Sequence, residues 1–210
     1  MSDTVPPAGT SDGTSGFDAV VLAGGAGSRL GGVDKAAVQL AGRSLLSRPL
    51  EAVRGARNLV VVGDTAAAVP ARALRVVEEP AGGGPAAASV AGLRAIQDPA
   101  EWTCLIACDV PGAVRAIQLL GAVDAGESDG VVLTEPAGRR QWLLGRYRSR
   151  ALRSAAQALG DPANRSMRAL LGELRLVDVP VDDVWRDVDT WDDHDRWTQA
   201  LDDGGGARPD

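Results

Sequence analysis

The stretch VVLAGGAGSRLGGVDKAAV, residues 20–38, places five glycines between an apolar run and a single lysine. An apolar run of this kind is typical of a buried strand, and glycines at its end let successive backbone N–H groups converge on an anion. Lys35 is the only lysine of the chain, because each of the other residues among the 22 Lys and Arg is arginine. The pattern predicts a strand followed by a phosphate-binding loop.

Outward from this stretch, short β-branched runs alternate with longer Ala- and Leu-rich segments, the pattern of a mostly parallel sheet covered by helices. Strands are predicted at residues 17–23, 58–64, 74–79, 103–109, 129–135, 141–148 and 175–181. Helices are predicted at 44–56, 85–97, 114–123, 151–159, 166–174 and from about residue 191. We therefore predict one three-layer α/β/α sandwich with a Rossmann-like sheet over residues 17–201, between flexible tails at 1–16 and 202–210.

Composition excludes several classes of protein. The net charge of −6 over 210 residues argues against a general nucleic-acid surface, and no apolar run approaches the length of about 20 residues that a membrane helix needs. The N-terminal residues lack the pattern of a secretory signal. Cys104 and Cys108 are predicted to be reduced and buried on one face of a strand, and His194 to lie on the surface. We expect a cytoplasmic protein.

Two familiar phosphate loops fit the glycine-rich stretch poorly. A Walker-type loop needs Gly-Lys followed by Ser or Thr, whereas Lys35 lies between Asp34 and Ala36. A dinucleotide fingerprint needs a third glycine where the chain has Leu30. Another kind of nucleotide loop is therefore expected.

The segment LAGGAGSRLGGVDK resembles the signature loop of the molybdenum cofactor guanylyltransferase family, within the nucleotidyltransferase superfamily. The positions that match are Leu22, Ala23, Gly24, Gly25, Arg29, Leu30, Gly31, Gly32, Asp34 and Lys35. Three further segments follow in the family's order: GGGPAAASVAGL at 82–93, ACDVP at 107–111 and DVDTWDD at 187–193. The resemblance implies the nucleotide-diphospho-sugar transferase type of fold.

The resemblance also implies an activity, the Mg²⁺-dependent transfer of GMP from GTP, or of a nucleotide from another NTP, to the phosphate of molybdopterin with release of pyrophosphate. The implied catalytic residues are Lys35, Arg29 and Asp109, and Asp109 is the implied metal ligand. Asp189 is predicted to be a second metal ligand, because a carboxylate that faces an anionic pterin phosphate would repel it without an ion between them, and contact with the acceptor is the alternative. Nucleotide contacts are implied for Leu22, Ala23, Gly24, Gly25, Lys35, Glu79, Gly84, Pro85 and Asp109. Neither nucleic acid nor membrane is an expected partner, and transient contact with molybdenum cofactor enzymes or chaperones is compatible with this activity.

The residue types suit this chemistry. The attacking phosphate is already an anion, so no protein nucleophile is required, and a compact ammonium such as that of Lys35 can lie among phosphate oxygens. Asp109 emerges from an apolar strand, where a carboxylate can hold Mg²⁺. A capping role ahead of Pro111 is the alternative for Asp109.

Some segments depart from the family pattern. Asp187 and Asp189 occupy positions that are usually Asn, and a solvated acidic surface is the alternative interpretation of this run. The sequence RRQW at 139–142 stands where the family often has a His-Pro pair. The arginines of residues 139–153 form either an exposed charged face or, through Arg146 and Arg148, a site for an anionic acceptor.

Three other functions remain compatible with the sequence. A cytidylyl or sugar-phosphate transferase of the same fold would need the same loop. A nicotinamide-dependent oxidoreductase would need an acidic residue for the ribose near the second strand, where Asp64 is available, but also the third loop glycine. A nucleotide-binding regulator without catalysis would keep the loop alone.

Overall fold

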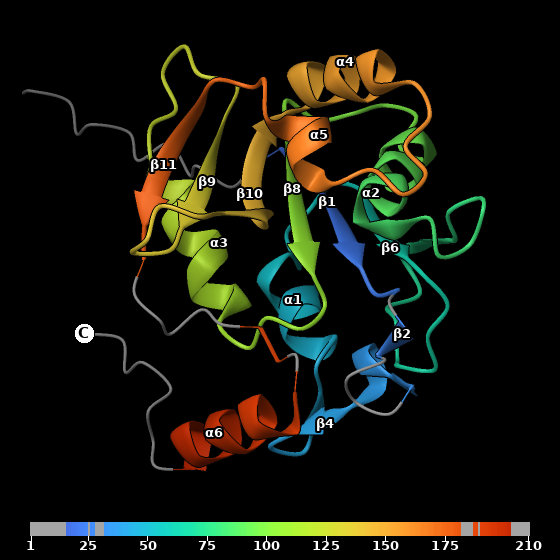
Figure 1. The fold of residues 1–210 in the computed structure, drawn as a ribbon, viewed down its shortest axis with the longest axis vertical. Helices are drawn as coiled ribbons and strands as arrows, with labels where there is room; N and C mark the ends of the chain where they lie inside the picture. The colour runs from blue at the N-terminus through green and yellow to red at the C-terminus, as the bar shows by residue number, and fades with distance from the viewer. Residues whose placement is uncertain (1–15, 25, 28–31, 182–186, 189, 203–210) are drawn as a thin grey trace, which may run out of the picture.

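A seven-stranded sheet forms the centre of the molecule (Figure 1). The structure is a computed structural model, and it describes residues 16–24, 26–27, 32–181, 187–188 and 190–202. The strands of the sheet are β1 (Phe17–Leu22), β6 (Leu59–Val62), β7 (Leu74–Val76), β8 (Trp102–Ala107), β9 (Gly130–Thr134), β10 (Arg140–Arg148) and β11 (Leu176–Pro180). Their order is β11-β9-β10-β8-β1-β6-β7. Each predicted strand is present within a few residues of its predicted bounds.

The sheet is parallel except for β10, which pairs antiparallel with both β8 and β9. In the parallel part, Leu22 of β1 lies opposite Val62 of β6 and Ala107 of β8. The carboxyl ends of these three strands therefore reach the same edge of the sheet, where ligands of open α/β sheets bind.

Helices cover both faces of the sheet, as predicted. Successive residues of β1 point to opposite faces, so Val21 joins the core under α1 (Ser47–Ala52) and α3 (Ala113–Ala122), while Val20 joins the core under α2, α4 and α5. The last three span Gly84–Ala95, Ser149–Leu159 and Met167–Leu171. The result is the three-layer sandwich. None of the helices within the described ranges has the length and apolarity that a membrane span requires.

Several short elements follow β1 that the sequence patterns do not reveal. They are β2 (Ala26–Gly27), β3 (Val33–Asp34), the 3-10 helix η2 (Lys35–Ala37), β4 (Gln39–Leu40) and β5 (Arg43–Ser44). The C-terminal helix α6 (Trp191–Asp202) lies beside β4, away from the main sheet (Figure 1). Leu40, Leu45 and Val188 form a small separate core there. The helix predicted at 44–56 is shorter than expected, because Ser44 belongs to β5 and α1 ends at Ala52.

The two cysteines and the histidine test three predictions. Cys104 and Cys108 are unpaired, buried and in the same core cluster, which confirms that they share a face. Burial raises the pKa of Cys104 to about 12, so its thiol stays protonated near neutral pH. His194 lies near the surface but is partly covered: its side chain is 18% exposed, and Nε2 lies 2.8 Å from the Gln39 carbonyl oxygen. The reason is that α6 folds back onto β4.

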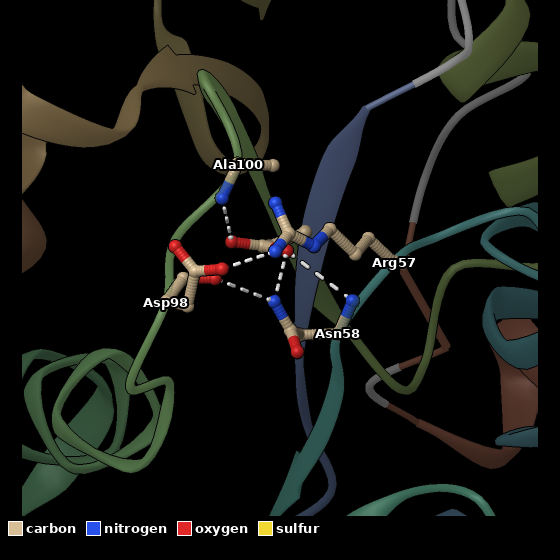
Figure 2. A network of polar contacts seen from close by, with 5 residues as sticks. Arg57, Asn58, Asp98 and Ala100 are labelled. Carbon is tan, nitrogen blue, oxygen red and sulfur yellow. Dashed lines mark hydrogen bonds and ion pairs between the residues drawn. The ribbon is translucent and has the colours of Figure 1, made fainter.

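A buried carboxylate joins three segments at the amino edge of the sheet. Asp18 is fully buried and accepts hydrogen bonds from the backbone N and side-chain Nδ2 of Asn58, at 3.2 and 2.7 Å, and from Ala100 N at 2.7 Å. Figure 2 shows how Asn58 and Ala100 approach this point, with the ion pair of Arg57 and Asp98 beside it. The carboxylate supplies the acceptors that these donors need, because buried donors without partners cost free energy.

We predict that Asp18→Asn lowers the free energy of unfolding by about 2 kcal/mol, because an amide nitrogen would face one of the backbone donors. For a chain of this size the melting temperature should fall by roughly 4–8 °C. Thermal and denaturant unfolding measure both quantities. Asp98→Asn is the matched control, since its ion pair with Arg57 is exposed and such pairs contribute little. Equal stability of the two variants would contradict the role given to Asp18.

Candidate active site

Lys35 and Asp109, 74 residues apart in the sequence, meet at the carboxyl edge of the parallel strands. Lys35 begins η2, and Asp109 follows the end of β8 by two residues. Lys35 Nζ lies 2.5 Å from Asp109 Oδ2, and the two side chains are only 14% and 15% exposed. The structure thus brings together two of the three residues predicted to be catalytic. An ion pair this shielded from water interacts more strongly than an exposed one.

The second carboxylate oxygen of Asp109 is the unusual atom of this site. Oδ1 is buried, and no residue in the described part of the chain donates a hydrogen bond to it. Buried carboxylate oxygens normally have partners, so this one stands out among the polar atoms of the described residues. The Asp109 carbonyl oxygen accepts from Val188 N at 3.0 Å, which ties the segment before α6 to the site. Burial, followed by the charge of Asp109, raises the pKa of Cys108 above its usual range.

Asp34 holds the loop that carries Lys35. Its carboxylate accepts a hydrogen bond from Ala36 N at 3.1 Å and so caps η2. It also accepts from Thr65 Oγ1 and Ala66 N, in the loop that follows β6. Sequence reasoning treated Asp34 only as a position of the motif, because Thr65 and Ala66 have no pattern of their own.

Gly24 shows a second reason for the glycines of the first loop. A Cβ on Gly24 would lie 3.2 Å from Gly63 Cα, and one on Gly63 would lie 2.2 Å from Gly24 N. Ala23 N and Gly24 N both donate to the Val62 carbonyl oxygen. Bare backbone is therefore required here by the close approach of two loops, and Gly63, which sequence reasoning missed, is part of that requirement.

The residues predicted after the third strand lie at the carboxyl end of β7, two strands away from β1. Glu79 and Pro85 are exposed, and Gly84 begins α2 with a positive φ of 87°. The preceding turn is closed by Gly82 N, which donates to Glu78 Oε1. The N-terminus of α2 therefore opens at the same edge of the sheet as Lys35 and Asp109.

A pocket of about 420 Å³ opens beside Asp109. Its polar lining includes Asp109, Asp187, Arg139, Arg140 and Gln141, and its apolar lining includes Trp142, Leu143 and Met167. The residues 139–142, which depart from the family pattern, thus form much of one wall. The departure of this segment from the family pattern is visible in the sequence, but its position beside Asp109 is visible only in the structure.

Ion pairs fix the two arginines of this wall. Arg139 Nη2 lies 2.5 Å from Glu135 Oε1, and Arg140 makes two hydrogen bonds to the Asp178 carboxylate, at 2.7 and 3.0 Å. These hydrogen bonds raise the pKa of both guanidinium groups, which therefore remain charged at any physiological pH. Each guanidinium group thus lines the pocket as one half of an ion pair with a neighbouring carboxylate.

Other predicted site residues lie elsewhere. Arg146 and Arg148, the alternative acceptor site, both lie over the Trp102 ring at 4.5 Å, near the amino end of β8 and away from Asp109. The acceptor role for them was wrong, because β10 runs antiparallel and carries them to the opposite edge. Gly25, Arg29 and Asp189 lie outside the described residues.

Comparisons with known proteins identify the family of this chain. Residues 19–179 match the model of the family described as MobA-like NTP transferase domain. A probable molybdenum cofactor guanylyltransferase from Opitutus terrae is 32% identical over 197 residues, which span 87% of this chain and 95% of the relative. A molybdenum cofactor guanylyltransferase from Acidiphilium cryptum is 42% identical over 51% of this chain, and the match spans 58% of that relative's length.

A solved structure supports the fold independently. The structure of a nucleotidyl transferase from Methanothermobacter thermautotroptrophicus superposes on this chain with a TM-score of 0.71 and 20% sequence identity. The likeness covers 90% of this chain and 99% of that structure. The sheet order, the extent of the family match and the Opitutus terrae relative agree: the chain belongs to the MobA-like NTP transferase domain family.

Proposed function

We propose that this protein is a nucleotidyltransferase that transfers GMP from GTP to the phosphate of molybdopterin and releases pyrophosphate. The observation that carries the proposal is the Lys35–Asp109 pair at the carboxyl edge of the parallel strands, in which Asp109 Oδ1 is buried and has no hydrogen-bond donor among the described residues. Membership of the family and the guanylyltransferase relatives support the choice of substrates.

For this reaction the protein must neutralise the charge of the phosphate groups and align the attacking and leaving oxygens. An oxygen of the acceptor phosphate forms a bond to the α-phosphorus of GTP, while the bond from that phosphorus to the bridging oxygen breaks. The electron pair of the broken bond leaves with pyrophosphate. Lys35 places a positive charge among the phosphate oxygens, and we assign Arg29 to the leaving pyrophosphate as a second clamp.

The residues of the site fit a divalent metal ion. Asp109 Oδ1 is buried and lacks a donor among the described residues, which leaves this oxygen available to a cation. Carboxylate oxygens are hard ligands that suit Mg²⁺. We propose Asp109 and Asp189 as the protein ligands. When bound there, Mg²⁺ would neutralise phosphate charge.

We assign the pocket beside Asp109 to the acceptor. Its volume of about 420 Å³ is within the usual range of small-molecule sites, roughly 300–1,000 Å³. Trp142 and Met167 offer an apolar surface for a flat ring, and Arg139 and Arg140 offer positive charge for an anionic group. A pterin that carries a phosphate combines these two features.

Pyrophosphate release tests the proposal most directly. The purified protein with Mg²⁺, GTP and molybdopterin should release pyrophosphate and form the dinucleotide, whereas ATP, CTP and UTP should support much slower release. Fast release with CTP, or with a sugar phosphate as acceptor, would assign the protein to another transferase of this fold. Nucleotide binding without any release would favour the regulator.

A cytoplasmic location belongs to the same proposal. Cys104 and Cys108 are both unpaired, which is compatible with a reducing compartment. GTP and a phosphorylated pterin are charged substrates that the cytoplasm would supply. Fractionation of the native cells tests this location.

A metal titration tests the assignment of Asp189. Asp189→Asn should raise the Mg²⁺ concentration for half-maximal rate by on the order of 10-fold, because one carboxylate would then hold the ion without the other. The titration is made at saturating GTP and acceptor. The acceptor KM should stay close to the wild-type value.

Asp187→Asn is the matched comparison for Asp189→Asn. Asp187 lines the acceptor pocket, and its charge acts on Arg139. We expect its replacement to change the acceptor KM and to leave the Mg²⁺ midpoint within about 2-fold, since the pocket and not the metal site loses a charge. An unchanged Mg²⁺ midpoint in Asp189→Asn would refute the metal role of Asp189.

A further inference from the structure

Asp34 connects the loop of Lys35 to a separate part of the sheet. Its Oδ1 accepts from Ala36 N at 3.1 Å, within η2. Its Oδ2 accepts from Thr65 Oγ1 at 2.7 Å and from Ala66 N at 2.8 Å, in the loop after β6. One side chain thus takes three hydrogen bonds from two loops that are about 30 residues apart in the sequence.

Thr65 is itself held firmly. It is only 6% exposed, and its hydroxyl accepts a hydrogen bond from Ala67 N at 3.0 Å. A hydroxyl has one proton, which leaves that proton for Asp34 Oδ2. The Thr65 carbonyl oxygen accepts from Arg75 Nη2 at 2.8 Å, and Arg75 belongs to β7. Asp34 is therefore tied through Thr65 to the central sheet.

The hydrogen bonds of Asp34 fix the backbone at the next residue, Lys35. Asp34 is the N-cap of η2, whose first residue is Lys35, and Lys35 Nζ then reaches Asp109 at 2.5 Å. A lysine side chain has many rotamers, so its ammonium is placed well only if its backbone is fixed. The close approach of Gly24 and Gly63 holds the same two loops together at a second point.

We propose that Asp34 and Thr65 are positioning residues that set the place of the Lys35 ammonium at the reacting phosphates. The proposal rests on the nucleotidyl transfer proposed above, and it gives Asp34 no contact with substrate. A carboxylate is needed because three donors point at this side chain. Asparagine has a single acceptor oxygen and would place an N–H₂ group against donors.

The reactivity of Lys35 tests the positioning without any need for catalysis. Because the chain has one lysine, acetylation by an amine reagent at that residue can be followed as the mass of a single peptide. In the wild type the paired, 14% exposed ammonium should react slowly. Asp34→Asn and Thr65→Val should react at least about 10-fold faster, because a displaced ammonium leaves Asp109 and meets solvent.

Two variants serve as controls for these changes. Thr65→Ser keeps the hydroxyl and should react as the wild type does. Asp124→Asn makes the same chemical change at an aspartate that also accepts from the backbone N two residues ahead, in this case Gly126 N at 2.9 Å, far from Lys35. It should leave both the reactivity of Lys35 and the transfer rate within about 2-fold of wild type.

Kinetics test the coupling between Asp34 and Lys35. Asp34→Asn should lower kcat/KM by about 10- to 100-fold, the scale of a misplacement of about 1 Å in a catalytic group. In a Lys35→Ala background, Asp34→Asn should lower kcat/KM by less than about 3-fold, since no ammonium remains to be placed. Thr65→Ser should restore the activity that Thr65→Val loses.

The outcomes separate this inference from the proposed activity. If the wild type proves inactive in transfer but Lys35 is acetylated faster in Asp34→Asn and Thr65→Val, the proposed function is refuted and the positioning is supported. An active wild type whose Asp34→Asn variant keeps wild-type acetylation and kcat/KM would overturn the positioning. So would equal losses from Asp34→Asn with and without Lys35, because they would indicate a general structural defect.

Discussion

Lys35→Ala is expected to lower kcat/KM for nucleotidyl transfer by roughly 10²- to 10³-fold, the cost of losing one preorganised electrostatic group. The ammonium acts on phosphate groups that are charged in both the ground state and the transition state. Triphosphate binding should therefore weaken while turnover slows. Steady-state kinetics of pyrophosphate release measure the loss of turnover, and calorimetry measures the loss of GTP affinity.

The site has little room for a larger cation in place of Lys35. Its Nζ is within 2.5 Å of Asp109 Oδ2 and is mostly shielded from water. Lys35→Arg should therefore be impaired as well, because a planar guanidinium cannot occupy the place of a compact ammonium. Arg43→Ala is the matched control, since Arg43 is a nearby cation whose pair with Glu51 is exposed. Wild-type kinetics in Lys35→Ala would remove the assignment of the first loop to phosphate binding.

The sequence predicted the layers of the fold because each relies on local patterns. Alternating apolar runs and Ala-rich segments identified every strand of the main sheet, including β10 and β11, and the helices between them. What the patterns could not show was how short segments pack on one another. The hairpin of β4 and β5 is too short to have a period. The position of α6 beside it depends on apolar side chains of α6, such as Trp197, that pack against the small core around Leu40.

The candidate site was predictable to a similar extent. The motif residues Lys35 and Asp109 were named from the sequence, and the structure places them in contact. Asp34 was named as a motif position, but its partner Thr65 lies in a loop that no pattern distinguishes. The direction of β10 in the sheet was also not predictable from the sequence. Arg146 and Arg148 share a strand with residues of the pocket wall, and only the antiparallel pairing of β10 with β8 shows that they lie at the far edge.

Asp109 contributes charge to the site in a way that asparagine cannot reproduce. An asparagine at this position could still accept a hydrogen bond from Lys35 Nζ through its amide oxygen, and the Asp109 carbonyl would still accept from Val188 N. A capping role in the turn before Pro111 would also survive. The substitution therefore keeps the local structure and removes the negative charge of a carboxylate whose buried Oδ1 has no donor within the described ranges.

We therefore expect Asp109→Asn to lower kcat by roughly 10²- to 10³-fold, equivalent to about 2.7–4 kcal/mol, while GTP affinity changes by less than about 3-fold. A charge that is needed mainly in the transition state affects turnover more than ground-state binding. Single-turnover rates across a Mg²⁺ titration, together with the melting temperature, separate lost catalysis from lost folding. Asp98→Asn makes the same change at an exposed carboxylate at the amino edge of the sheet, and its kcat and melting temperature should match those of the wild type. Full activity of Asp109→Asn at every Mg²⁺ concentration would show that the carboxylate has only a capping role, and the metal assignment would fail with it.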